Sequence, residues 1–419
     1  MKRNIFLGLM VVGTILIYSC TRESLFENTI DQTGIDQLSE THFVPLDAAL
    51  HIADLQKNPH AKGSAITEYL EFKKNGDRAE FYIINYPQAG FIIIPGDDRL
   101  IPILAYSENS HFPLCDSIIP WGVTDWLNSV SSFVDSIRQS DMEQNASVKY
   151  NWESVIVGKN PIFKPASSPA KTDYCSLVWE WGEENDQDDC GRDGNIIGEF
   201  YYYVPELLDT EWGQADGYNE EIAYGGCETT LNGRYLVGCV AVAVGQVMLE
   251  NRFPTSFDWD GIFNDGFPFG EETNTFLRDI GLSGNLNMSY GCYASLAYES
   301  DAINYLISSG YTSTSSTYTI SSSTILSNVR YGYPVIFSGG SSGSRHMWVC
   351  DGIQSFYNVV CFAAGGSYDY RYEYNGNRQY LHMNWGWYGN YDGWFSMYNF
   401  NPGGFNFNYN KRLIYNIIH

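Results

Sequence analysis

The order of apolar and polar residues first indicates a small mixed domain in the N-terminal third of the chain. Apolar residues follow helical spacing from Phe43 to Leu55, and Trp126–Ile137 has the pattern of a second helix. Between them, the runs Phe81–Asn85 and Phe91–Ile94 are separated by a short segment with proline and glycine. Two apolar runs around such a turn predict a β-hairpin. We therefore expect an α+β domain over residues 41–140.

The composition changes in the segment that follows. Residues 158–173 contain three prolines, three lysines and several small residues. Such a segment is typical of an exposed linker that a protease can reach. We therefore expect a linker with an activation cleavage region over residues 141–175. A second, larger domain is expected over residues 176–419, where Tyr, Gly, Asn and Ser are frequent, as in strands joined by turns.

The N-terminus has the charge and hydropathy order of an export signal. A short basic start precedes Ile5–Ile17, an apolar run that is too short for a comfortable membrane span. The sequence Leu16–Cys20 resembles a bacterial lipobox, which implies a signal peptide over residues 1–19 and lipidation of the Cys20 thiol. Residues 20–40 would then be a polar tether. An ordinary signal with a nearby cysteine is the alternative. We expect an exported bacterial lipoprotein that is anchored in the outer membrane, on its periplasmic or cell-surface face, and from which the mature protein can be released.

Composition and charge narrow the classes of function. The chain of 419 residues is 44% apolar and only 17% charged, which suits a strand-rich globular protein. A formal net charge of −25 repels phosphate backbones, so no nucleic acid partner is expected. The nine cysteines include no CxxC pair, which argues against a structural zinc site. We expect no metal and no cofactor. Export permits disulfides, but the sequence leaves their pairing open.

One cysteine stands at the start of a segment rich in small and apolar residues. Cys239 opens a run that continues as a predicted buried helix to about Glu250, although its valines favour strands. At a helix N-terminus, free backbone N–H groups and the helix dipole stabilise a thiolate. The alternative is that Cys239 is a small buried apolar residue. This segment alone leaves both interpretations open.

A thiolate nucleophile needs a base, and only two histidines of the C-terminal domain are reasonable candidates. His346 follows a Gly/Ser-rich loop and begins a predicted strand, a position that can face a cleft. His382 lies within an apolar and aromatic stretch, where a hydrogen-bonded sheet histidine is the favoured interpretation. We therefore expect His346 to be the base.

Several stretches of the chain follow the order of one family's motifs. They are Pro205–Gln214 with Gly217–Asn219, Gly238–Met248, Phe257–Asp260, His346–Gly352, and His382–Trp387 with Asp392–Phe395. In this order they resemble the streptopain family of cysteine peptidases, in the papain-like clan. The resemblance implies an α+β, papain-like fold of two subdomains, with a central nucleophile helix packed against an antiparallel sheet. Upstream, Gly90–Arg99 and Pro102–Ser107 resemble that family's inhibitory propeptide. An ordinary α+β accessory domain is the alternative there.

The resemblance also implies roles for individual residues. Cys239 would attack the scissile carbonyl, and His346 would hold the thiolate and protonate the leaving amine. Gln214 would donate a side-chain N–H to the oxyanion, together with the backbone N–H of Cys239. Asn384 and Trp385 lie where the family orients and shields the histidine. The sequence does not tell whether the Asn384 side chain or the Trp385 carbonyl does the orienting.

Together these observations predict a lipid-anchored zymogen of a cysteine endopeptidase. Its partners would be protein or peptide substrates, its own propeptide, and the membrane through the lipid anchor. The alternative is a non-catalytic surface lipoprotein, such as a degenerate peptidase homologue, that binds protein or glycan through its many aromatic residues.

Overall fold

The computed structural model describes residues 41–56, 66, 68–74, 76–114, 119–158, 176–181, 195–265, 268–341, 344–364, 367–397 and 411–419. The predicted export signal, Cys20, the tether and residues 159–173 of the predicted cleavage region lie outside these residues. Within the described ranges, no helix combines the length and the hydropathy needed to cross a bilayer.

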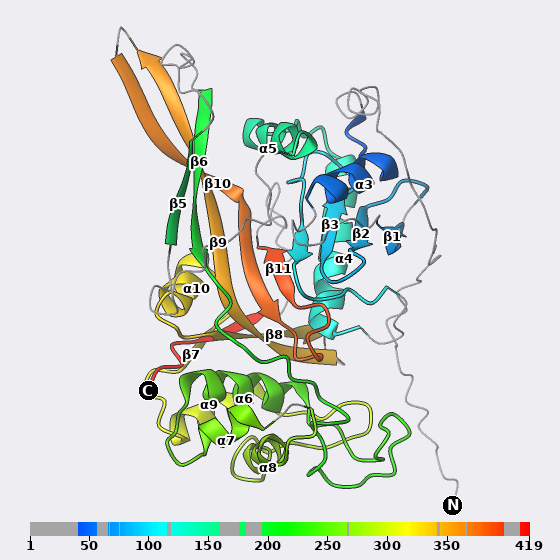
Figure 1. Ribbon diagram of the computed structural model, residues 1–419, viewed down its shortest axis with the longest axis vertical. Coiled ribbons are helices and arrows are strands. Elements are labelled where there is room, and N and C mark those ends of the chain that lie inside the picture. Colours follow the sequence, from blue (N-terminus) through cyan, green and yellow to red (C-terminus); the bar gives the residue numbers. More distant parts are fainter. Residues whose placement is uncertain are drawn as a thin grey trace, which may run out of the picture.

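The N-terminal domain is a small antiparallel sheet with helices beside it (Figure 1). The predicted hairpin is present as β2 and β3, whose residues are all buried. The domain therefore has its own apolar core, as the α+β prediction requires. Its elements are α3 (Leu46–Leu55), β1 (Glu68–Phe72), β2 (Phe81–Asn85), β3 (Phe91–Pro95), β4 (Ala105–Ser107), α4 (Trp121–Arg138) and α5 (Ala146–Ile156).

Three helices of this domain differ from the prediction. Helix α3 begins at Leu46 instead of Phe43, because Phe43 pairs with Asp97 in an isolated β-bridge and Pro45 precedes the helix. Helix α4 begins at Trp121 instead of Trp126, directly after Pro120, a residue that suits a helix start.

Helix α5 lies inside the segment 141–175 that the sequence assigned to the linker. Its Asn145 side chain accepts from the Ser147 backbone N–H, and Trp152 is buried in the domain core. Residues up to Ile156 therefore belong to the N-terminal domain, because α5 buries Val148, Trp152 and Val155 in its core.

The C-terminal domain has a helical part and a sheet part (Figure 1). Helices α6 to α9 lie together at one end of the sheet. The helices are α6 (Cys239–Asn251), α7 (Trp259–Asn264), α8 (Glu271–Ile280), α9 (Glu299–Ser308) and α10 (Ser322–Val329). The strands are β5 (Ser176–Trp181), β6 (Asn195–Val204), β7 (Ser315–Thr317), β8 (Val335–Ser341), β9 (Ser344–Ala364), β10 (Ser367–Asn384), β11 (Gly393–Ser396) and β12 (Arg412–Tyr415).

Helix α6 is the centre of this domain. Every residue from Cys239 to Leu249 is buried, which explains why a valine-rich run is helical: a helix that is apolar on all sides is buried on all sides. It shares one apolar core with Met347 and Val349 of strand β9. Before it, Gly238 has a φ of 95°, and a Cβ there would lie 2.5 Å from Met288 Cε. The predicted α+β fold, with this helix packed on an antiparallel sheet, is confirmed.

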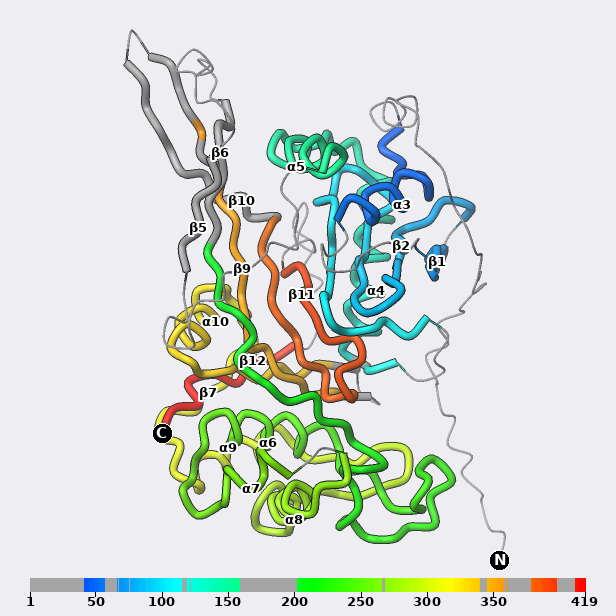
Figure 2. Tube along the Cα trace, viewed as in Figure 1, coloured from blue at the N-terminus to red at the C-terminus, as the bar shows by residue number. Residues whose placement is uncertain are grey.

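The strands of both domains form one antiparallel sheet. Its main path runs β1-β2-β3-β4-β11-β10-β9-β8-β12-β7 among the described residues. The domains meet where β4 pairs with β11, with Tyr106 opposite Trp394 and Ala105 opposite Phe395. Figure 2 shows the two parts of the chain side by side at this junction. The N-terminal domain therefore extends the sheet of the C-terminal domain at its edge.

Candidate active site

Cys239 and His346 line the same cavity. It has a volume of about 320 Å³ and lies between the start of α6, the start of β9 and the segment that leads into α9. The cavity is lined by both apolar and charged side chains, among them Leu296, Glu299 and Arg412. Helix α6 and strand β9 bring together two residues that are 107 positions apart in the sequence. The structure thus places the two predicted reactive groups at one surface.

The thiol of Cys239 is enclosed at the N-terminus of α6. Its side chain is buried, and the backbone N–H groups of Met347, Cys239 and Val240 donate to the sulfur. Burial nevertheless raises the pKa of the thiol, because a thiolate loses its hydration there, and the three amides only oppose that rise. The predicted helix-start position is confirmed. The expected lowering of the pKa by that position is overridden by burial.

His346 is held by a backbone carbonyl. Its Nε2 lies 2.9 Å from the oxygen of Trp385, and a carbonyl oxygen can only accept, so Nε2 carries a proton. In the neutral ring, the lone pair is then on Nδ1. The imidazole also stacks on Trp348, with ring centres 5.9 Å apart. Burial lowers the pKa of His346 to about 4, against the opposing effect of the Trp385 carbonyl.

These two shifts together determine the charge state of the pair. The thiol holds its proton more tightly than usual, and the imidazole binds one more weakly. Transfer of the proton from Cys239 to His346 is therefore unfavourable in this form of the chain. The pair is an uncharged thiol and imidazole, as expected for a latent site.

The peptide segment that holds His346 is itself fixed by buried side chains. The Trp385 N–H donates to Asp392 Oδ1 at 2.8 Å, and the Gly386 N–H donates to Asn384 Oδ1 at 3.1 Å. Asn384 makes no described contact with the imidazole. The Trp385 carbonyl therefore orients the histidine, and Asn384 supports the peptide unit that carries this carbonyl. Asp392 belongs to the family's last motif, Asp392–Phe395, but no role was predicted for its side chain.

Gln214 lies near this segment but does not line the cavity described above. Its side chain is almost fully buried, and Nε2 donates to the Gly386 carbonyl across 3.4 Å, a long hydrogen bond. Its own backbone carbonyl accepts from the Val237 N–H at 2.8 Å, which places its backbone beside the residues that precede Cys239. The oxyanion role of Gln214 stays a prediction.

Comparison with known families identifies both domains. Residues 257–395 match the model of the Peptidase C10 family, and residues 41–134 match that of the Spi protease inhibitor. The chain carries a Peptidase C10 domain behind an inhibitor domain. This confirms the resemblance to the streptopain family and makes the protein the zymogen of a cysteine peptidase. The C10 match includes His346 and Trp385 but begins after α6, so the place of Cys239 rests on the geometry above.

Two solved structures are similar in fold. Prointerpain A of Prevotella intermedia, solved as a fragment with a cysteine-to-alanine mutation, has 19% identity and a TM-score of 0.51. The likeness covers 83% of this chain and 98% of that one. The active wild-type interpain A cysteine protease of the same organism has 22% identity and a TM-score of 0.39. It covers 52% of this chain and 96% of its own. No curated protein gives a significant match.

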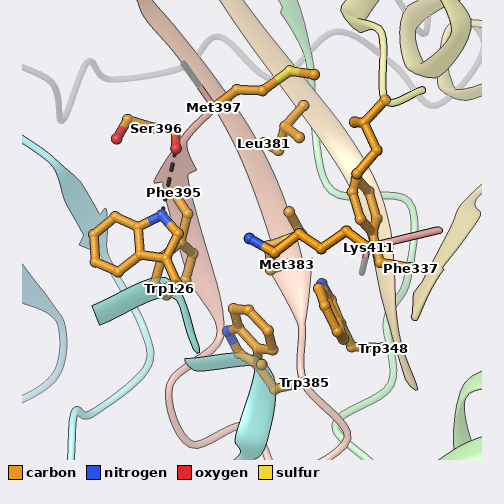
Figure 3. A pocket seen from close by; sticks show the side chains of 12 residues that line it. Trp126, Phe337, Trp348, Leu381, Met383, Trp385, Phe395, Ser396, Met397 and Lys411 are labelled. Carbon is orange, nitrogen blue, oxygen red and sulfur yellow. Dashed lines mark hydrogen bonds between the residues drawn. The ribbon is translucent and has the colours of Figure 1, made fainter. Parts of the chain in front are cut away.

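The inhibitor domain packs against aromatic side chains close to His346. Figure 3 shows Trp126 of α4 close to Phe395, Trp385 and Met383 of the C10 domain. The Trp126 ring meets Phe395 edge-on with centres 5.0 Å apart, and its Nε1 donates to the Ser396 carbonyl. At Gly122, helix α4 comes so close to the Trp385 and Trp348 rings that a Cβ there would lie 2.4 Å from Trp385 Cζ3, so the propeptide packs on the two aromatic side chains next to His346.

His382 belongs to a separate cluster of charges in the C10 domain. Its Nδ1 lies 2.7 Å from Asp351 Oδ1, and Asp351 Oδ2 also accepts from the Leu208 N–H. Burial disfavours the charged ring, but Asp351, Glu206 and Asp392 outweigh burial and raise the pKa of His382 to about 9. His382 is not among the residues that line the cavity with Cys239. It is therefore a paired sheet histidine, as the sequence favoured.

A disulfide lies close to the site. It joins Cys227 to Cys292, so the segment between Gln214 and Cys239 is tied to the loop that leads to the cavity. The sequence had left this pairing open. Among the described residues, no group of three or more His, Cys, Asp or Glu side chains could hold a metal ion.

Proposed function

We propose that Cys239 and His346 are the catalytic dyad of this C10 peptidase and that it cleaves peptide bonds within proteins. One observation carries the proposal: both side chains line one cavity, and the Trp385 carbonyl fixes His346 with its lone pair on Nδ1. An imidazole in this tautomer can accept the thiol proton and later return it. The rival interpretation, a non-catalytic binding protein, gives no reason for this arrangement.

The proposed reaction has two stages. In the first, the Cys239 thiol proton passes to His346 Nδ1, and the sulfur forms a bond to the scissile carbonyl carbon. The tetrahedral intermediate expels the amine, which takes the proton from His346, and leaves a thioester. In the second, His346 removes a proton from water, the hydroxide attacks the thioester, and the acid product leaves as the proton returns to the sulfur. The two stages together consume one water molecule and restore the thiol and the neutral imidazole.

Gln214 is the proposed side-chain donor to the oxyanion. In the propeptide-bound form its Nε2 donates to the Gly386 carbonyl through a long hydrogen bond. A negatively charged oxygen is a stronger acceptor than a peptide carbonyl. We propose that the oxyanion of a bound substrate replaces Gly386 as the acceptor, and that the Cys239 backbone N–H is the second donor.

The test compares the activated wild-type chain with Cys239→Ala and Cys350→Ala. Cys350 is the matched control, because it is the other free cysteine among the described residues and is also buried. The readouts are hydrolysis of casein and labelling by an epoxide probe of thiol peptidases. We expect Cys239→Ala to lose both, and Cys350→Ala to keep both.

Two results would contradict the assignment of Cys239 as the nucleophile. One is equal labelling of the wild type and Cys239→Ala. The other is casein hydrolysis that survives the loss of the Cys239 thiol. Absence of hydrolysis in the wild type after cleavage of the linker would favour the binding protein.

We also propose that the zymogen is exported and anchored through a lipid on Cys20. The support is the apolar run Ile5–Ile17 followed by the lipobox-like sequence that ends at Cys20. Expressed in a bacterium, the full chain should sediment with membranes and partition into detergent. A Cys20→Ala variant should lose this partitioning, since the lipid chains would supply the anchoring. Equal partitioning of both proteins would contradict the lipid anchor.

A further inference from the structure

A single polar side chain interrupts the apolar surface of the nucleophile helix. Gln246 lies on α6, seven residues after Cys239, and only 1% of its surface is exposed. Burying an amide is unfavourable unless all its polar atoms find partners. The rest of α6 from Cys239 to Leu249 is built from small and apolar residues. The role of Gln246 can therefore be inferred from the groups to which its side chain hydrogen-bonds.

The partners of Gln246 fix the direction of its amide. The Trp212 N–H can only donate, and it lies 3.3 Å from Gln246 Oε1, which also accepts from the Thr210 hydroxyl at 2.8 Å. These two donors fix the position of Oε1, so the other amide atom, Nε2, is the one that faces Asn384. It donates to Asn384 Oδ1 at 3.1 Å.

The amide of Asn384 is fixed in the same way. Its Nδ2 donates to the Thr210 carbonyl, 2.7 Å away, which can only accept. Oδ1 therefore receives two hydrogen bonds, one from Gln246 Nε2 and one from the Gly386 N–H. Both amides are fully determined by backbone groups around them, so neither can rotate without losing a buried hydrogen bond.

The last step of this chain of hydrogen bonds reaches the base. The Gly386 N–H belongs to the planar peptide unit whose carbonyl, that of Trp385, accepts from His346 Nε2. A hydrogen bond to the N–H end of a peptide unit fixes its plane and strengthens its carbonyl as an acceptor. The orientation of His346 thus depends on Asn384, and that of Asn384 on Gln246.

We propose that Gln246 is a positioning residue that couples the nucleophile helix to the catalytic histidine. Helix α6 presents Cys239 at its N-terminus and, about 10 Å further along its axis, holds the support of the base. Movement of α6 relative to strands β9 and β10 would then displace nucleophile and base together. The inference rests on the proposed dyad and adds a residue that touches neither reacting group.

The first test measures kcat, KM and the pH profile of the activated enzyme with Gln246→Met. The control is Gln379→Met, because Gln379 is also a buried glutamine of the C10 domain, whose Nε2 donates to Ser355, away from His346. We expect kcat to fall about 10- to 100-fold in Gln246→Met, with KM little changed, since a small misplacement of a catalytic group has effects of this size. The control should keep the wild-type kcat.

The second variant, Gln246→Glu, keeps the proposal testable if the Gln246→Met variant folds poorly. The introduced carboxyl, when protonated, can donate to Asn384 Oδ1 as the amide does, whereas the ionised carboxylate faces that oxygen without a donor. Activity relative to the wild type should therefore be near normal at about pH 5 and fall at least about tenfold as the carboxyl ionises. This pH-dependent loss is not expected from a purely structural role.

The two hypotheses fail in different ways. Equal kcat and equal pH profiles in Gln246→Met and Gln379→Met would overturn the positioning role, as would a pH-independent activity ratio in Gln246→Glu. Wild-type activity that does not depend on Cys239 would instead overturn the proposed dyad.

Discussion

The histidine of this site is oriented by a main-chain oxygen. The Trp385 carbonyl fixes the tautomer of His346 and carries only a partial charge, so it stabilises an imidazolium less than a carboxylate would. Burial then prevails and lowers the pKa of His346 to about 4, while burial raises that of Cys239. At the residue scale, the zymogen therefore keeps both reactive groups in place without charging them.

The residues of the site were only partly predictable from the sequence. Cys239 was predicted from its place at a helix start, and His346 from its place between a loop and a strand. The family motifs supported both predictions. The sequence left two candidates for the orienting group, the Asn384 side chain and the Trp385 carbonyl, because a backbone carbonyl has no signature in a sequence. Asp392 stands in a family motif, but its role was not predicted, because its contact with the Trp385 N–H depends on a turn between β10 and β11.

Helix α4 of the inhibitor domain depends on one small residue where it meets the C10 domain. A Cβ at Gly122 would lie 2.4 Å from Trp385 Cζ3 and 3.1 Å from Trp348 Cε3. Glycine is a poor helix former, so its place in α4 is explained by this close approach to the two rings. The latency of the zymogen should therefore be sensitive to the size of this side chain.

We predict that Gly122→Ala speeds self-activation of the full chain. Alanine favours the helix by about 1 kcal/mol, but overpacking at the two tryptophans costs about 1–3 kcal/mol at the interface. The control is Asn128→Ala, a half-buried position on the same helix. Time courses of propeptide loss, followed by gel, should be faster for Gly122→Ala than for both the wild type and the control. An unchanged or slower time course would show that this contact does not limit activation.

Elements with strong local patterns were predicted well. The β2–β3 hairpin and helix α6 each follow from a short run of sequence, and both are present. The start of α4 was missed because its first turn contains Gly122, a poor helix former. Helix α5 was missed although Val148, Trp152 and Val155 follow helical spacing, because the segment was assigned to the linker together with the proline-rich residues after it. The Cys227–Cys292 pair could not be predicted, since pairing depends on how two loops meet in space.

At the scale of the molecule, the propeptide and the peptidase share one sheet. The contact between β4 and β11 includes the hydrogen bond from the Ser396 N–H to the Leu104 carbonyl, 2.9 Å long. These residues are far apart in the sequence, so no local pattern could predict that the inhibitor domain docks as an added strand. The same packing places α4 against Trp348 and Trp385, beside His346.

This arrangement gives a physical account of latency. Burial keeps the thiol and the imidazole neutral, and the propeptide adds to the cover of the aromatic wall beside His346. Release of the propeptide should admit water to that wall, reduce the cost of charge and allow the thiolate–imidazolium pair to form.

The most direct test is the rate at which iodoacetamide alkylates Cys239 as a function of pH, measured by mass spectrometry of the peptide that contains it. In the full chain the raised thiol pKa predicts slow alkylation at neutral pH and a rise only at pH values above the ordinary pKa of a cysteine thiol. After propeptide cleavage the rate at neutral pH should be much higher and nearly independent of pH. Identical pH profiles before and after cleavage would contradict the account.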